Sequence, residues 1–94
     1  MCVGVLTLDC LVTESQSLKD KRHVLSSMTE RIRRSFNVAI CEVEYQDQWQ
    51  RTRLAAVFVN TSWRMMQSTM AKVAEFAGRD RRLEVLAVET RQLC

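Results

Sequence analysis

The sequence predicts a single α+β domain in which two helices cover one face of a four-stranded antiparallel sheet. Four segments have the residues and alternation typical of strands, and two have apolar residues at helical spacing. The 94 residues are enough for one domain with one modest core. The chain has no proline and only 2 glycines, which argues against long loops and linkers. We therefore expect residues 1–94 to fold as one domain.

Residues 2–12 form the first expected strand. Leu6, Leu8, Cys10 and Val12 point to one side, and we assign that side to the core. The opposite side mixes apolar and polar residues, as in a sheet covered on one face only.

The first expected helix begins after Ser17 and ends near Phe36. Ser17 and Asp20 have the spacing of a capping box. The apolar stripe of this helix is formed by Leu18, Leu25, Met28, Ile32 and Phe36.

Residues 37–45 and 51–60 are expected to be strands joined by the polar loop 46–50, most simply as a hairpin. Thr61 or Ser62 can cap a second helix, and Gly78 is placed to terminate it. A basic turn follows at residues 79–82, and residues 83–90 form the last expected strand. The predicted core of the whole domain includes Leu6, Leu8, Leu25, Met28, Ile32, Phe58, Met70 and Val73.

The resulting order is strand, helix, strand, strand, helix, strand. With right-handed connections, this order gives the ferredoxin-like βαββαβ split fold. Both helices then lie on one face of the sheet, and no element remains to cover the other face.

Several short motifs in the chain resemble those of the YlxP-like family of small bacterial proteins. The motifs keep their order over nearly the whole chain: Ser17-Leu18-Lys19-x-Lys21-Arg22, Phe36-Asn37-Val38, Glu42-Val43 and Asp47-x-Trp49-Gln50-Arg51. The resemblance implies a ferredoxin-like domain of unknown function. Genes of this family often lie near those for translation initiation and ribosome maturation factors, which implies a role near the ribosome by association only.

The first helix carries the basic excess of the chain. Residues 17–36 contain six basic and two acidic residues, a net charge of +4, against +3 for the whole chain. A basic helix face is typical of a protein that binds nucleic-acid phosphates, although a solvated helix face is the plainer interpretation. The candidate nucleic-acid or anion-binding residues are Lys19, Lys21, Arg22, Arg33 and Arg34.

The polar loop is the second candidate site. Trp49 can stack on a base and Arg51 can meet a phosphate, with Asp47 and Gln50 beside them. The plainer interpretation is that Trp49 folds back over the open sheet or a subunit interface, where an amphipathic tryptophan is favoured.

The sequence indicates no enzyme, no metal and no cofactor. Cys2, Cys10, Cys41 and Cys94 form no Cys-x-x-Cys pair, and His23 is the only histidine. No glycine-rich phosphate loop and no nucleophile motif is present. Without a signal peptide or a membrane-length apolar run, we expect a cytoplasmic protein that does not insert in membranes.

Two hypotheses for function follow. The first is a non-enzymatic basic binding module associated with RNA or with a ribosomal partner. The alternative is a dimeric protein-interaction or small-ligand regulatory module, because the open sheet face or a strand edge favours a homo-oligomer.

Overall fold

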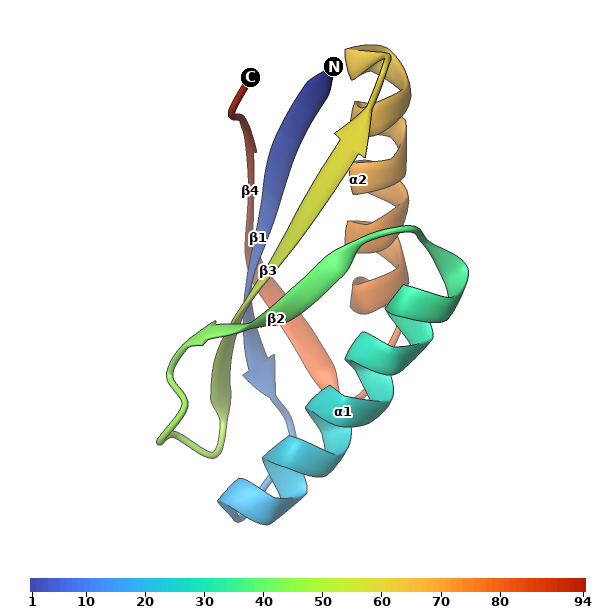
Figure 1. The fold of residues 1–94 in the computed structure, drawn as a ribbon. Helices are drawn as coiled ribbons and strands as arrows, with labels where there is room; N and C mark the ends of the chain where they lie inside the picture. Colours follow the sequence, from blue (N-terminus) through green and yellow to red (C-terminus); the bar gives the residue numbers. More distant parts are fainter.

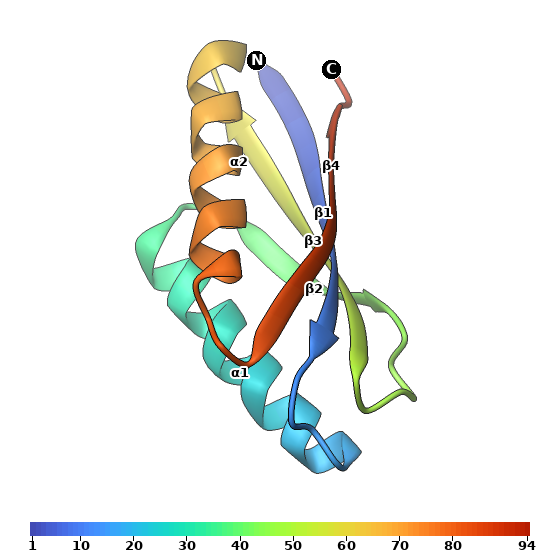
Figure 2. The same cartoon turned by 180° about the vertical axis from the view of Figure 1, so that it is seen from behind.

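The computed structural model describes all residues 1–94 and contains four strands and two helices. They are β1 (Cys2–Val12), α1 (Leu18–Ser35), β2 (Ala39–Glu44), β3 (Arg51–Asn60), α2 (Trp63–Gly78) and β4 (Leu83–Gln92). The strands pair antiparallel in the order β2-β3-β1-β4. Both helices lie on the same side of the sheet (Figures 1 and 2). The predicted ferredoxin-like arrangement is confirmed.

The core lies between the helices and the sheet. Alternate residues of β1 point into it, because successive side chains of a strand face opposite sides. The residues that the sequence assigns to the core are all buried: Leu6, Leu8, Leu25, Met28, Ile32, Phe58, Met70 and Val73.

The helix ends follow the predicted caps with one difference. Ser17 Oγ accepts a hydrogen bond from Asp20 N at 3.0 Å, but Asp20 Oδ2 accepts from Gln16 N at 3.1 Å. A full capping box would return that bond to Ser17 N. Gly78 is the last residue of α2, as expected, and it ends the helix without a positive φ. Neither helix is long and apolar enough to cross a membrane.

Three strand ends differ from the expectation, and one of them is the end of β2 at Glu44, one residue before the expected Tyr45. β2 begins at Ala39, which pairs with Val57, so residues 37 and 38 belong to the connection. β4 continues to Gln92, because this residue still pairs with Gly4. Strand ends are set by the partner strand, which the local sequence does not reveal.

Three connections meet at one end of the sheet, where β1 ends. Val12 N donates to Gln50 O and Thr13 N donates to Arg82 O, each at 2.9 Å. The β2–β3 loop and the turn before β4 are therefore tied to the end of β1. The first turns of α1 lie at the same end (Figure 1).

Candidate functional site at the β2–β3 loop

A buried lysine anchors the β2–β3 loop, which spans residues 45–50. Lys21 lies on the inner side of α1 and is only 1% exposed. Its Nζ donates to Tyr45 O and, at 2.7 Å, to Gln48 O. It also forms an ion pair with Glu42 Oε2 at 2.8 Å. An ammonium has three donors, so these acceptors satisfy all of them and compensate the buried charge.

Other contacts hold the loop in one shape. Tyr45 has a φ of 67°, in the left-handed region that a bulky residue rarely adopts. Its carbonyl accepts from Gln48 N at 3.0 Å as well as from the lysine beneath. The Gln50 side chain donates to Ser15 O at 3.0 Å, which joins the loop to the connection before α1. The loop is therefore fixed from both ends and from below.

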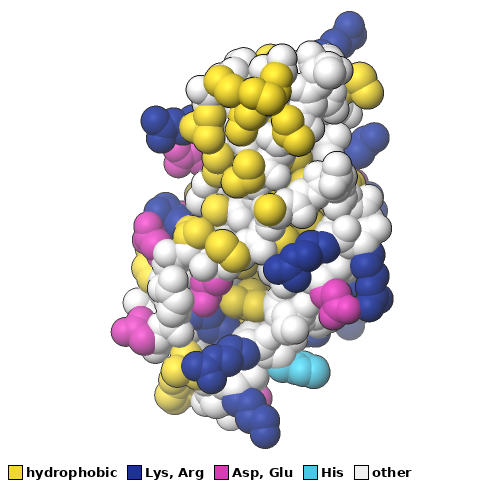
Figure 3. All heavy atoms as spheres, viewed as in Figure 1, with side chains coloured by type: hydrophobic (Ala, Val, Ile, Leu, Met, Phe, Trp, Pro, Cys, Tyr) yellow, Lys and Arg dark blue, Asp and Glu magenta, His cyan; other side chains and the backbone are white.

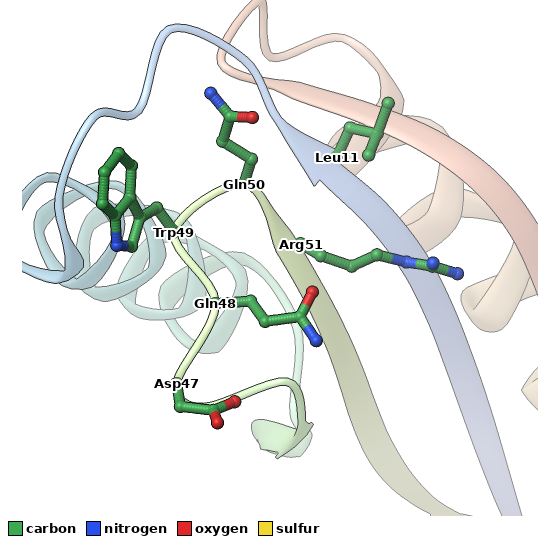
Figure 4. A pocket seen from close by; sticks show the side chains of 6 residues that line it. All are labelled: Leu11, Asp47, Gln48, Trp49, Gln50 and Arg51. Carbon is green, nitrogen blue, oxygen red and sulfur yellow. The ribbon is translucent and has the colours of Figure 1, made fainter.

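A shallow cavity of about 420 Å³ opens beside this loop. It is lined by Leu11, Asp47, Gln48, Trp49, Gln50 and Arg51. Trp49 is 51% exposed, so it neither folds back over the sheet nor enters the core. The Arg51 guanidinium lies 4.7 Å from the centre of the Tyr45 ring. Figure 4 shows Trp49 and Arg51 extending in different directions from the loop.

The structure separates the basic residues of α1 into different environments. Lys19 and Arg22 are exposed and form no ion pair. Arg34 pairs with Glu30 at 2.6 Å, and Arg33 donates to Ile40 O at 2.9 Å. Lys21 cannot reach an external anion, so its placement among surface anion-binding residues is wrong. Its stem is buried, and its charge is used inside the protein.

Glu42 is the functional neighbour that the sequence analysis missed. It follows the buried Ile40 by two residues, so alternation along β2 places it on the helix-covered face. A carboxylate on that face needs a partner, and Lys21 shares the buried side of α1 with Leu25 and Met28. The alternation along β2 and the helical spacing along α1 together could have predicted the pairing of Glu42 with Lys21.

The open face of the sheet has a charged half and an apolar half. In the charged half, Arg53 bridges Asp9 and Glu44 at 2.9 Å each, and its hydrogen bonds hold the pKa of Asp9 below its usual value. In the apolar half, Val57 and Val59 are exposed. Figure 3 shows hydrophobic side chains in the upper part of the view, where β1 and β3 lie. Lys and Arg side chains lie below, near the start of α1.

Comparisons with known proteins identify relatives of unknown function. The family described as "Protein of unknown function (DUF503)" matches residues 3–90. The "Uncharacterized protein YlxP" of Bacillus subtilis (strain 168) is 35% identical over 74 residues, covering 79% of this chain and 80% of that protein.

Proposed function

Since the chain belongs to the DUF503 family, whose function is unknown, we propose a function from its own surface: it is a non-enzymatic cytoplasmic module that binds single-stranded RNA. The observation that carries the proposal is an exposed tryptophan on a loop that a buried lysine holds in place. The RNA contacts are the β2–β3 loop and the first turns of α1. Ribosomal RNA is the first ligand to examine.

Trp49 supplies the stacking surface. Base stacking on an aromatic side chain contributes about 1–3 kcal/mol and tolerates any base. The anchored loop presents this ring without having to become ordered on binding, which lowers the entropic cost of association. Stacking on a loop also differs from the mode of the ferredoxin-like RNA-recognition domains, which use strand aromatics. The central strands here offer no exposed aromatic, since Phe58 is buried.

Lys19, Arg22 and Arg51 supply positive charge at the end of the domain where the loop lies. Lys19 and Arg22 lie in the first turns of α1, and Lys21 joins those turns to the loop. None of the three cations is compensated by an ion pair. Arg51 extends away from Trp49 (Figure 4), so the two side chains suit a base and a separate phosphate of one strand. We expect most contacts to be with phosphates, and hence little sequence preference.

Titration of a labelled oligouridine, followed by fluorescence anisotropy, tests the proposal. Trp49→Ala should weaken binding by about 5- to 150-fold, the equivalent of one lost stacking contact. Met65→Ala, which removes an exposed apolar side chain at the start of α2, is the matched control and should bind like the parent.

Arg22→Ala tests the charge, with Arg64→Ala at the start of α2 as its control. Arg22→Ala should reduce the slope of log affinity against log salt by about 0.7, the value for one lost phosphate contact on a single strand. Equal effects of Trp49→Ala and Met65→Ala, or no RNA binding by the parent, would overturn the proposal.

Self-association through the open sheet face is the second candidate. Val59 is 59% exposed in the apolar half of that face, and the residues of β4 from Leu86 onward are exposed at an unpaired edge. We propose a second copy of the chain as the occupant, in line with the preference of soluble oligomers for two-fold symmetry. Sedimentation velocity should show a dimer that Val59→Lys dissociates. A monomer at high concentration of the parent would end this candidate.

A further inference from the structure

Four arginine side chains surround one cavity on the far side of α1 from β2. The cavity has a volume of about 520 Å³ and is lined by Arg31, Phe76, Arg79, Asp80, Arg81 and Arg82. We call it the arginine pocket. Its floor is fixed to the sheet, because Thr13 Oγ1 donates to Arg81 O at 2.8 Å and Thr13 N donates to Arg82 O at 2.9 Å.

The arginine pocket carries more positive than negative charge. Its four guanidinium groups meet only two carboxylates, those of Asp80 within the pocket and Glu75 beside it. Arg81 is exposed and has no carboxylate partner. Two positive charges are thus uncompensated, and they lie on a surface that the β2–β3 loop does not reach.

The Asp80 carboxylate orients arginines at one rim of the pocket and leaves the cavity itself open. Its side chain is 8% exposed and accepts hydrogen bonds from Arg82 N, Nε and Nη2 at 2.9, 3.0 and 2.8 Å. These bonds hold the pKa of Asp80 below its usual value, so it stays ionised. Arg31 lies 3.7 Å from the same carboxylate, and its guanidinium is 5.2 Å from the centre of the Phe76 ring. Two of the four arginines are therefore pre-oriented at one rim of the cavity.

We propose that the arginine pocket binds a terminal phosphate group, a monoester or a pyrophosphoryl group. Planar guanidinium groups match phosphate oxygens in paired hydrogen bonds, which lysines cannot reproduce. Two uncompensated positive charges match a phosphate monoester, whose charge near neutral pH is about −1.5 to −2. A backbone diester carries only one negative charge per nucleotide and fits less well. The ligand is therefore a free phosphorylated molecule or the 5′-phosphorylated end of an RNA.

Two-dimensional NMR of the arginine Nε–Hε groups during titration with sodium pyrophosphate tests the site directly. The signals of Arg31, Arg81 and Arg82 should shift together and saturate. Arg81→Ala should raise the dissociation constant about tenfold, the loss expected for one charge-assisted hydrogen bond near the surface. Arg91→Ala removes the same charge near the other end of β4 and should change the dissociation constant of pyrophosphate by less than about twofold.

A second titration identifies the source of the phosphate. Oligouridines with a 5′-phosphate and with a 5′-hydroxyl are compared on the parent, Arg81→Ala and Trp49→Ala. Tighter binding of the 5′-phosphorylated strand, lost in Arg81→Ala, supports the RNA end as ligand. Equal binding of both strands together with saturable pyrophosphate binding supports a free phosphorylated molecule.

Trp49→Ala separates this inference from the proposed function. It should leave pyrophosphate binding unchanged even if it abolishes oligouridine binding. The inference is overturned if pyrophosphate shifts none of the three arginine signals, or if Arg91→Ala weakens its binding as much as Arg81→Ala does.

Discussion

Replacement of the buried lysine by methionine should destabilise the whole domain. Lys21→Met keeps most of the buried stem but removes the ammonium that binds two backbone carbonyls and Glu42. Removing one partner of a buried ion pair costs about 3–5 kcal/mol, because the other charge stays uncompensated. Glu42 is 19% exposed and keeps its hydrogen bond from Thr52 Oγ1, so the lower part of that range applies here. Even this loss is a large fraction of the stability of about 5–15 kcal/mol of a small domain.

Urea unfolding followed by circular dichroism measures the effect. With a slope of about 1–3 kcal/mol per molar urea, the midpoint of Lys21→Met should fall by about 2 M. Lys19→Met removes an exposed lysine two residues earlier and should stay within about 0.5 kcal/mol of the parent. In a double-mutant cycle, Lys21→Met and Glu42→Leu should show a coupling of about 1–3 kcal/mol. A loss below about 1 kcal/mol for Lys21→Met would refute the structural role assigned to this side chain.

Three further predictions concern the core and the titratable groups. Ile32→Ala should lower the free energy of unfolding by about 2–5 kcal/mol, because the side chain is fully buried, and a calorimetric loss below 1 kcal/mol would contradict this. Burial raises the pKa of the Cys10 thiol to about 11, so a thiol reagent at neutral pH should label the exposed Cys41 and leave Cys10 unmodified in the folded protein. Hydrogen bonds from Arg82 lower the pKa of Asp80, so its contribution to stability is complete above the usual value of 3.8 and is lost as the pH falls through the lowered folded-state value. Asp80→Asn should therefore be less stable than the parent at pH 7 and lose less stability than the parent on acidification; an identical acid dependence in both proteins would contradict this.

The fold could be predicted because local patterns and global packing agree. Alternation in β1 and the helical spacing of Leu25, Met28 and Ile32 each identify one inward-facing side. Ser17 and Ser62 cap the helices where the sequence places them. Strand ends were less predictable, because the last residues of β4 are defined by pairing with Gly4 and not by their own composition.

The candidate site could be predicted only in part. The polar loop identified Trp49 as a candidate, but the sequence favoured a ring folded back over the sheet or an interface, whereas the structure shows the ring exposed. The role of Lys21 in anchoring the loop could not be predicted from the sequence, because two of its three partners are backbone carbonyls, which any residue could provide. Of the arginine pocket, the sequence predicts only the basic turn at residues 79–82. Its fourth member, Arg31, comes from another helix, and only the packing of α1 beside that turn brings it close.

Tryptophan fluorescence during RNA titration tests the proposed function most directly. In Trp63→Phe, Trp49 is the only tryptophan, and in Trp49→Phe only Trp63 remains, partly buried at the start of α2. If RNA stacks on the β2–β3 loop, oligouridine should quench the emission of Trp63→Phe in a saturable manner and leave that of Trp49→Phe unchanged. Oligouridine that binds both variants by anisotropy but leaves the emission of Trp49 unchanged would contradict the proposed site.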